Sequence, residues 1–328
     1  MIQLQKYKGM FVSGYSRAAH KTGILISGLN IILDAGLDVQ RSFDHVFITH
    51  QHLDHVKFLP QYTLNTKNEK KINVVSTERI ISKVKPYVSS TLMMSKNISD
   101  KNTASSLKYL KYLKSIEQSE HKEHTEHTEH TEYIECVSHA IKVLEQTQHV
   151  YMDDEMYLKV AHIKFNPISI GGTYTFANGR ENWRVELIKC THSVDSIGFG
   201  FSVQKKKLKP EFASLSNSEI KKIKDVYEIT AITEEKIFLF LGDTNKKVLE
   251  NVTIYEYPTI IIECTYFEDG EQPLAKKNKH IHWDDIKNII IKNEKIQFIL
   301  IHFSMKYTDE HIRTFFGKQN ICNLSCII

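Results

Sequence analysis

The sequence lacks any long apolar run. No uninterrupted stretch approaches the roughly 18 residues that a membrane-spanning helix needs, which excludes a membrane protein. Cysteines are also few: there are five in 328 residues, odd in number and irregularly spaced. Such cysteines are typical of reduced thiols in an intracellular protein and not of a disulfide framework. The first residues, MIQLQKYKGMFVSGYSR, have no apolar stretch of the secretory type. We therefore expect a location in the cytoplasm or nucleus, with organelle import left open because this stretch has no acidic residue.

The composition is nevertheless that of a folded protein. Apolar residues make up 41% of the chain and charged residues 25%, which excludes a wholly disordered chain. The 43 basic and 39 acidic residues leave a net charge of +4, which permits an anionic partner without requiring one. A length of 328 residues suits one large domain or two of ordinary size.

Short apolar strand patterns recur along the chain. Residues 22–35 read as two strands joined by a turn, and 236–243, 259–265 and 298–304 are apolar almost throughout. Apolar strands without alternation are typical of a sheet covered on both faces. Helical patterns follow in each half, including the amphipathic segment Trp283–Ile291. This order predicts stacked sheets with helices outside them.

The composition changes between about 95 and 135, where polar segments end in the repeat HKEHTEHTEHTE. We interpret this stretch as a low-complexity insertion within a single domain spanning residues 1–328. The alternative is a metal-binding tract formed by His121, His124, His127 and His130. A three-residue spacing drifts around a helix and forms no single face, which favours the first interpretation.

The clearest chemical signal is the segment His50-Gln-His52-Leu-Asp54-His55, which directly follows an apolar strand. In an extended backbone alternate side chains share a face, so His50 and His52 can bind one ion together. Asp54 and His55 come after a turn and face a second point. An isolated histidine usually has a structural role, but four ligand-type residues within six positions favour a metal site.

Three further ligand-type residues stand at the ends of apolar strands, namely His192, Asp243 and His302. Taken singly, each has an equally good structural explanation, such as a turn cap or a hydrogen bond to the backbone. Their occurrence in this order after the histidine segment indicates that they complete one metal centre.

Together these motifs resemble the metallo-β-lactamase superfamily and, within it, the short eukaryotic form of ribonuclease Z, the endonuclease that removes 3′ trailers from precursor tRNA. The likeness covers nearly the whole chain outside the insertion. It is carried by LDAG at 33–36, HQHLDH at 50–55, HSVDSIG at 192–198, FASLSNSEI at 212–220, LGDT at 241–244, ECT at 263–265, LAKKNKHIHW at 274–283 and HFSMKY at 302–307. The resemblance implies an α/β (α+β) fold of four layers, the αββα sandwich, with a dinuclear metal site at one edge of the sheets.

The resemblance also implies how the metal ligands are divided. One Zn²⁺ is expected on His50, His52 and His192, and a second on Asp54, His55 and His302, with Asp243 bridging the two. Imidazole and carboxylate ligands suit Zn²⁺, although Mn²⁺ is an alternative. Two neighbouring ions can activate a water molecule and clamp both sides of a phosphoryl displacement. Asp54 is also expected to accept a proton, and Asp34 to orient the histidine loop.

The leaving ribose oxygen needs a proton, and the resemblance assigns this step to a pair formed by Glu263 and His280. His282 lies two residues further on and is expected to face the same way and to contact the substrate; a capping or surface role is the equal alternative. Six basic side chains are expected to contact substrate phosphate. They are Lys205, Lys206, Lys207, Lys276, Lys277 and Lys306. For Lys205, Lys206 and Lys207 the alternative is a solvated basic loop.

The sequence departs from the family pattern in three places. Val56-Lys57-Phe58 follows the histidine segment where many relatives have Gly-Gly, which we expect to narrow the approach to the metals. Ile262 stands where relatives have a histidine. Ribonuclease Z commonly grips the tRNA elbow with a long arm, whereas the corresponding segment here, QKKKLKPEF at 204–212, is brief.

The function predicted from the sequence is a zinc-dependent endoribonuclease that removes the 3′ trailer of precursor tRNA and leaves a 3′-hydroxyl on the tRNA. A homodimer is implied by the resemblance alone. One alternative is a small-molecule metallohydrolase of the same fold, such as a phosphodiesterase, thioesterase or lactonase. A second alternative is an RNA-binding subunit that has lost catalysis, which is disfavoured because all seven expected ligand positions are filled.

Overall fold

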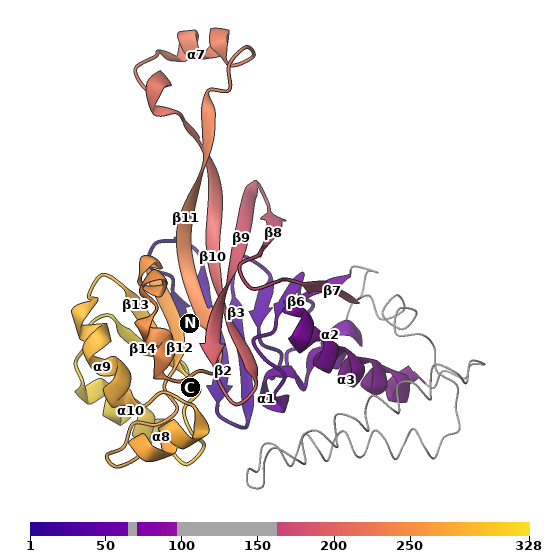
Figure 1. The fold of residues 1–328 in the computed structure, drawn as a ribbon, viewed down its shortest axis with the longest axis vertical. Helices are drawn as coiled ribbons and strands as arrows, with labels where there is room; N and C mark the ends of the chain where they lie inside the picture. The colour runs from indigo at the N-terminus through magenta and orange to yellow at the C-terminus, as the bar shows by residue number, and fades with distance from the viewer. Residues whose placement is uncertain (65–70, 97–162) are drawn as a thin grey trace.

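The computed structural model describes residues 1–64, 71–96 and 163–328. Within these residues two seven-stranded sheets pack face to face, each strand pairing with its neighbour in chain order. Figure 1 shows α2 and α3 on the outer side of the first sheet and α8, α9 and α10 on the outer side of the second. The predicted four-layer αββα sandwich is therefore confirmed.

The elements have the following bounds. The first sheet contains β1 (Ile2–Gln3), β2 (Phe11–Arg17), β3 (Lys21–Ile26), β4 (Ile31–Leu33), β5 (His45–Phe47), β6 (Ile72–Ser76) and β7 (Ile163–Pro167). The second contains β8 (Thr173–Asn178), β9 (Glu181–Thr191), β10 (Asp195–Leu208), β11 (Thr230–Leu241), β12 (Thr259–Glu263), β13 (Gln297–Ile301) and β14 (Leu324–Cys326). The helices are α1 (Leu53–Val56), α2 (Leu59–Leu64), α3 (Glu78–Lys96), α7 (Asn217–Ile223), α8 (Gln272–Asn278), α9 (Trp283–Lys292) and α10 (Asp309–Lys318), with 3₁₀ turns at Pro210–Phe212, Lys246–Glu250 and Val252–Glu256.

Both sheets have the same internal plan. Each begins with antiparallel strands and continues with parallel ones, from β4 to β7 in the first sheet and from β11 to β14 in the second. Parallel strands are normally buried on both faces and read as continuous apolar runs. In β12, TIIIE, all five residues are buried, as the sequence predicted. Ile261 faces the other sheet, whereas Ile260 and Ile262 face the helices.

The core between the sheets is rich in aromatic rings. Phe47 of β5 lies with its ring centroid 5.2 Å from that of Phe199 and 5.0 Å from that of Phe201, both on β10. Phe201 in turn stacks on Phe238 of β11 at 4.4 Å. All four side chains are fully buried, so their packing fixes how close the two sheets lie.

The local sequence patterns explain several connections. Residues 22–35 form β3 and β4, joined by a turn in which Gly28 and Asn30 have φ of 90° and 49°. These left-handed conformations suit glycine and asparagine. A capping box at Ser216 and Glu219 begins α7, as its sequence predicts.

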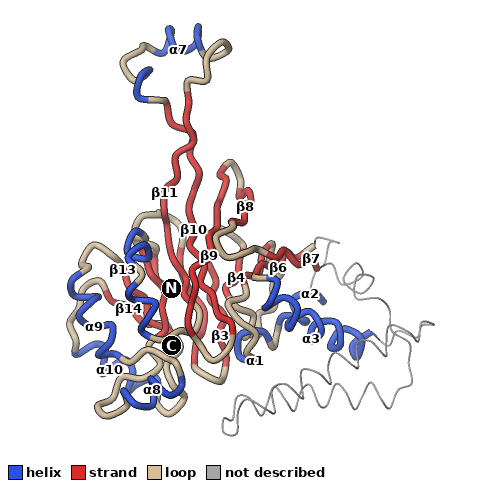
Figure 2. Tube along the Cα trace, viewed as in Figure 1, coloured by secondary structure: helices blue, strands red, loops and turns tan. Residues whose placement is uncertain are grey.

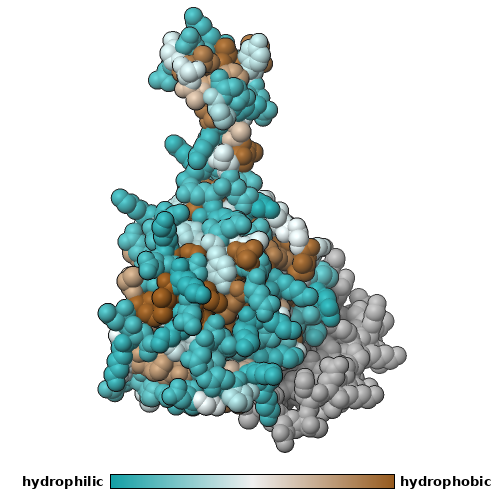
Figure 3. Space-filling model, turned by 60° about the vertical axis from the view of Figure 1, so that its left-hand side comes forward, coloured by the Kyte–Doolittle hydropathy of each residue, from teal (hydrophilic) through white to brown (hydrophobic). Residues whose placement is uncertain are grey.

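The most extended feature is a ribbon formed by β10 and β11, which projects far beyond the sandwich and carries α7 at its tip (Figures 1 and 2). We call residues 204–234 the arm. The pairing of the two strands continues to its end, from Gln204 opposite Glu234 to Leu208 opposite Thr230. Figure 3 shows that the arm is largely hydrophilic, with hydrophobic residues gathered towards its tip; Val226 and Tyr227 there are exposed.

The expectation of a brief arm is therefore wrong. The apolar pattern marks the second strand only from residue 236, but β11 begins at Thr230. No other layer among the described residues covers this two-stranded ribbon. Residues 230–235 are accordingly mostly polar and carry no apolar strand signal. The ribbon becomes visible only through its pairing with β10.

The remaining sequence expectations concern the insertion, a membrane-spanning helix and the cysteines. The insertion predicted at about 95–135, with its histidine repeat, lies outside the described residues apart from its first two positions. Among the described helices, none is sufficiently long and apolar to cross a membrane. The cysteines at 190, 264, 322 and 326 are all free thiols.

Substitution by alanine is predicted to have opposite effects on stability at Gly200 of the closely packed β10 and at Gly317 of α10. A Cβ atom at Gly200 would lie 2.1 Å from the hydroxyl oxygen of the buried Tyr257, so Gly200→Ala should lower the free energy of unfolding by about 1–3 kcal/mol. In α10, Gly317 has no atom within 4 Å of an added Cβ, and Gly317→Ala should raise it by up to about 1 kcal/mol because alanine favours helix. Denaturant unfolding measures both, and shifts of the same sign would contradict this account.

Candidate metal centre

The candidate ligands stand on loops that leave the strands at one edge of the sandwich. His50, His52, Asp54 and His55 follow β5 of the first sheet, the last two within α1. The other three follow strands of the second sheet, namely His192 after β9, Asp243 after β11 and His302 after β13. The structure brings all seven together, although the sequence separates them widely.

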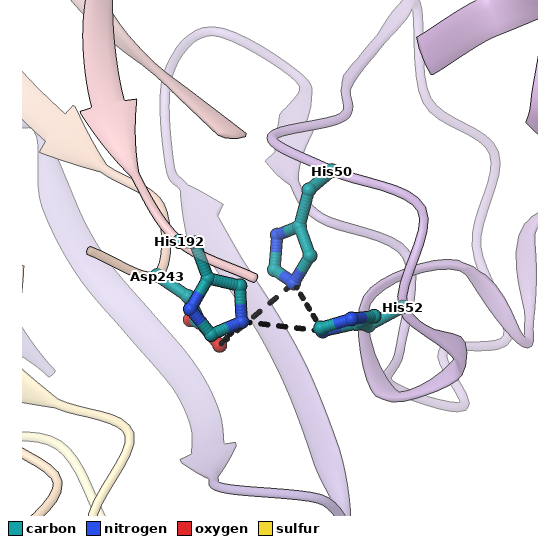
Figure 4. Close-up of side chains that lie close together, drawn as sticks. All are labelled: His50, His52, His192 and Asp243. Atoms are coloured by element: carbon teal, nitrogen blue, oxygen red, sulfur yellow. Dashed lines mark hydrogen bonds and ion pairs between the residues drawn. The ribbon is translucent and has the colours of Figure 1, made fainter. Parts of the chain in front are cut away.

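The first group of donor atoms contains three imidazoles and one carboxylate (Figure 4). The Nδ1 atom of His52 lies 3.1 Å from Nε2 of His50 and 3.4 Å from Nε2 of His192. The Oδ2 atom of Asp243 lies 3.8 Å from Nε2 of His50 and 3.9 Å from Nε2 of His192. Ligand distances of about 2.0–2.2 Å put neighbouring donors of a tetrahedral Zn²⁺ site roughly 3.4 Å apart, so this set fits such an ion.

The second group contains Asp54, His55 and His302. Nε2 of His55 lies 3.4 Å from Nε2 of His302 and 3.3 Å from Oδ2 of Asp54. Asp243 also reaches this group: its Oδ1 is 3.5 Å from Nε2 of His55 and its Oδ2 is 3.2 Å from Nε2 of His302. Asp243 thus lies between the two groups, where the predicted bridging ligand belongs.

Buried hydrogen bonds orient the histidine loop of the first sheet. The Oδ2 atom of Asp34 lies 2.7 Å from Nδ1 of His55, and the backbone N–H of Thr49 donates to Oδ1 of Asp34 at 2.8 Å. The hydroxyl of Thr49 lies 3.0 Å from Nδ1 of His50. Because Asp34 engages Nδ1 of His55, the Nε2 atom of that ring points to the site. This is the orienting position expected for Asp34.

Thr265 orients His302 in a similar way. Its hydroxyl donates to Oε2 of Glu263 at 2.7 Å and lies 3.1 Å from Nδ1 of His302. A hydroxyl has one proton to donate, and that of Thr265 is used in the hydrogen bond to the Glu263 carboxylate. The Thr265 oxygen therefore accepts a hydrogen bond from the Nδ1–H of His302. The neutral His302 ring then carries its lone pair on Nε2, the atom that faces Asp54 and His55.

Burial keeps the imidazoles of the first group neutral. It lowers the pKa of His50 and of His192 well below the usual value, and the pKa of His52 to about 4. A neutral imidazole has a lone pair that a metal ion can accept. These three rings are therefore in their metal-binding form at neutral pH.

The second group has the opposite electrostatic character. Burial by itself disfavours ionised carboxyl groups, but the neighbouring rings of His55 and His302 hold the pKa of Asp54 and of Asp243 well below the usual range. Conversely, burial of His55 is outweighed by these carboxylates, which raise its pKa well above the usual value. Two buried anions side by side require cations, and protons compete with metal ions for the same atoms.

Glu263 and His280 lie directly beside the metal ligands. Nδ1 of His280 lies 2.8 Å from Oε1 of Glu263, and its ring centroid is 4.9 Å from that of His192 and 5.3 Å from that of His302. Glu263 is fully buried and also accepts hydrogen bonds from Thr265 and from the backbone N–H groups of residues 244 and 281. With its lone pairs so occupied, Glu263 acts as an acceptor that holds the His280 ring by Nδ1–H.

The expected substrate contact by His282 is wrong. Its side chain is fully buried at the N-terminus of α9, where Nδ1 accepts from the backbone N–H of Asp284 at 3.2 Å. Its Nε2 donates to the carbonyl of Glu268 at 2.9 Å. Both ring nitrogens are therefore used within the fold, and the capping alternative is the right one.

The basic residues predicted to contact substrate are spread over two regions. Lys205, Lys206 and Lys207 are exposed on the arm, where Lys205 pairs with Glu235 at 2.7 Å. Lys276 and Lys277 are exposed at the end of α8, just before His280, and Lys306 lies over the ring of Tyr266 in an ion pair with Glu271. The second region therefore lies near the metal centre and the first on the arm.

The departures from the family pattern have structural explanations. Val56 is buried in the hydrophobic core, so it does not narrow the approach to the metals as expected. The Lys57 ammonium donates to the carbonyl of His20. Ile262 faces the helices and not the metal centre, so the absence of a histidine there removes no ligand from this site. Sequence reasoning missed Thr49, which has no motif of its own, and gave Thr265 no role although it lies in the ECT segment.

Known proteins resemble this chain in sequence and in fold. No model of a known protein family matches it. It is 27% identical over 321 residues to tRNase Z TRZ1 of Arabidopsis thaliana, which covers 94% of this chain and 92% of that protein. A ribonuclease Z of Borrelia duttonii is 30% identical over 145 residues, 38% of this chain and 45% of that protein. Among solved structures, the metallo-β-lactamase fold protein YhfI of Bacillus subtilis superposes with a TM-score of 0.51 at 10% identity, over 97% of this chain and 95% of that one.

The chain thus shares its fold with a metallo-β-lactamase fold protein, and two bridged histidine–aspartate groups lie at the edge of that fold. Its sequence relatives include proteins named tRNase Z or ribonuclease Z.

Replacing the buried Asp34 tests how far metal binding depends on the orientation of His55. Asp34→Asn keeps the shape but removes the charge that engages His55 Nδ1, and should weaken Zn²⁺ affinity about 10–100-fold. Asp38→Asn, the same change at an exposed position four residues later, should leave the affinity unchanged. Titration of the metal-free protein with Zn²⁺ measures both; equal affinity in the Asp34 variant and the parent would show that the contact has no such role.

Proposed function

We propose that this protein is a metal-dependent endoribonuclease that removes the 3′ trailer from precursor tRNA by phosphodiester hydrolysis, leaving a 3′-hydroxyl on the tRNA. The observation that carries the proposal is the pair of donor groups bridged by Asp243, with Glu263 and His280 at its side. The nearly full-length likeness to a tRNase Z supports the choice of substrate.

Two Zn²⁺ ions per chain are the proposed cofactor, with Mn²⁺ as the alternative. Imidazole nitrogens and carboxylate oxygens are ligands that Zn²⁺ accepts readily, and the donor spacing fits it. When bound, two such ions supply an activated water and positive charge where the phosphate accumulates negative charge. His50, His52 and His192 would hold one ion; Asp54, His55 and His302 would hold the other.

The protein's own residues then handle the protons. The Asp54 carboxylate, ionised and held at the edge of the second group, accepts a proton from the attacking water. His280, fixed by Glu263 through Nδ1, donates a proton to the leaving ribose oxygen from the other side of its ring. Asp54 thus acts as the general base and His280 as the general acid, so the two proton transfers use separate groups.

The arm supplies binding energy at a distance from the reaction. Its three consecutive lysines, Lys205, Lys206 and Lys207, offer positive charge to a phosphate backbone, and such contacts are strong in low salt and blind to sequence. The resemblance implies a long arm that binds the tRNA elbow, and the ribbon of β10 and β11 is long enough to be that arm. Assembly as a homodimer and an intracellular location belong to the same proposal, the first by resemblance and the second from cysteine usage.

The decisive experiment compares a trailer-bearing precursor tRNA with bis-p-nitrophenyl phosphate as substrates of the Zn²⁺-loaded protein. We expect one cut in the precursor, giving a tRNA with a 3′-hydroxyl and a trailer with a 5′-phosphate. Asp54→Ala should lower the rate at least about 100-fold, since it removes both a ligand and the proton acceptor, while tRNA binding persists.

Two results would favour the alternatives. Hydrolysis of the small ester without trailer cleavage would identify a small-molecule phosphodiesterase. RNA binding with less than one metal ion per chain would identify a binding subunit without catalysis. Parental cleavage by the Asp54 variant would remove that residue from the mechanism.

Shortening the arm should separate binding from chemistry. Residues 206–232 can be replaced by a two-residue Asn-Gly turn, because Lys205 and Thr233 face each other across the ribbon. The KM for precursor tRNA should then rise at least about tenfold, corresponding to roughly 1.4 kcal/mol of lost binding, with hydrolysis of bis-p-nitrophenyl phosphate unchanged. An unchanged KM would show that the arm does not contact the substrate.

A further inference from the structure

A charged side chain is buried where the two sheets meet beside the metal centre. Arg17 is the last residue of β2 in the first sheet, and its side chain is only 3% exposed. A buried guanidinium is unfavourable unless acceptors satisfy its N–H groups. The acceptors of Arg17 all belong to the other half of the molecule, between the end of β13 and the first residue of α10.

This one side chain holds most of that segment. Its Nε donates to the carbonyl of Phe303 at 3.1 Å, and its Nη2 donates to the carbonyl of Ser304 at 2.8 Å and to that of Tyr307. Its Nη1 donates to Oδ1 of Asp309, the first residue of α10, at 2.6 Å. The backbone N–H of residue 18 adds a bond to the Phe303 carbonyl at 3.1 Å. The guanidinium fork thus fixes both ends of the loop.

The loop held in this way begins at a candidate metal ligand. His302 has a φ of 64°, in the left-handed region, which costs of the order of 1 kcal/mol for a residue with a side chain and persists only where neighbours enforce it. Its Nε2 meets Asp54 and His55, which belong to the first sheet, at 3.5 Å and 3.4 Å. Whether the three can share an ion therefore depends on how this loop is tied to the first sheet.

A different contact ties the first sheet to the loops of the other donor group. The backbone N–H of Ile197, in β10, donates to the carbonyl of Thr49 at 3.1 Å. Next to Asp243, Gly242 packs so tightly on Thr49 that an added Cβ would lie 2.6 Å from the Thr49 Cβ. The two donor groups consequently have separate attachments between the sheets, and Arg17 belongs to that of His302.

We propose that Arg17 is a positioning residue that holds His302 against Asp54 and His55 and so maintains the second metal-binding group selectively. The proposal rests on the metal centre of the proposed function. Arginine is required because its planar fork of five N–H donors reaches acceptors on several sides at once, whereas a lysine ammonium is a single point with three donors.

The test compares Arg17→Lys with Arg79→Lys in the full-length protein. Both keep the charge, and Arg79 also bridges the two halves, through an ion pair with Asp195 at 3.0 Å. Arg79 is however 81% exposed, and its partner Asp195 begins β10 and does not belong to the loop that starts at His302. Metal-free protein is titrated with Zn²⁺ alone. We expect the parent and the Arg79 variant to bind two ions with the same affinities, and the Arg17 variant to bind one ion normally and the other at least tenfold more weakly.

A second readout separates positioning from general destabilisation. In Arg17→Lys, kcat on precursor tRNA should fall while KM stays near the parental value, and excess Zn²⁺ should restore part of the lost kcat. A merely structural role would lower the amount of folded protein without this rescue.

The outcomes are distinguishable from failure of the proposed function. If the parent binds fewer than two ions, the dinuclear centre itself is wrong. If the parent binds two and Arg17→Lys binds both with parental affinity, the role of Arg17 is overturned. Should Arg17→Lys fail to fold, Asp309→Ala removes only the solvent-side acceptor of Arg17; a weaker affinity for one ion then supports the proposal, and unchanged affinities for both overturn it.

Discussion

The structure depends on one constraint: donor atoms from two separate sheets must lie within about 3–4 Å of one another. Asp54 and His55 come from the first sheet, while Asp243 and His302 come from the second, and their donor atoms lie 3.4–3.5 Å apart across the two sheets. A shift of one sheet by the width of an atom would abolish this arrangement. The interlocked aromatic core between the sheets limits such a shift.

Around this constraint the chain fixes three of the five ligand rings by their second nitrogen. Asp34 engages His55, Thr49 lies against His50 and Thr265 against His302, all in buried positions. Asp34 and His302 both have left-handed backbone conformations, which are unfavourable for residues other than glycine. The fold therefore supplies strain and hydrogen bonds at the edge of the sheets, where preorganisation serves metal binding and catalysis.

In the proposed function, binding and chemistry are divided between two parts of the molecule. The candidate metal centre is buried and held by hydrogen bonds, whereas the arm is a two-stranded ribbon that no other described element covers, carrying lysines and an exposed tip. A large substrate that is held far from the reacting bond can be recognised without disturbing the buried site. The proposal of a precursor tRNA substrate makes use of this separation.

The sequence alone was sufficient for features that depend on neighbouring residues or on strand ends. The strands of 22–35, the buried β12, the helix at 283–292 and the histidine segment all followed from local spacing. It also named Asp243 and His302, because polar residues that directly follow apolar strands meet at one edge of a sheet.

Tertiary structure decided what local spacing does not encode. Residues 230–235 form a strand only because β10 pairs with them, and their polar side chains gave no sign of the arm. His282 and His280 alternate along the chain as two site residues would, yet His282 caps α9 because the chain turns into the helix there. Arg17 looks in the sequence like one basic residue among 43, and only the contact between two sheets gives it four acceptors beside His302. Patterns along a chain report which faces are buried, whereas the partners of a buried polar group depend on segments brought together by folding.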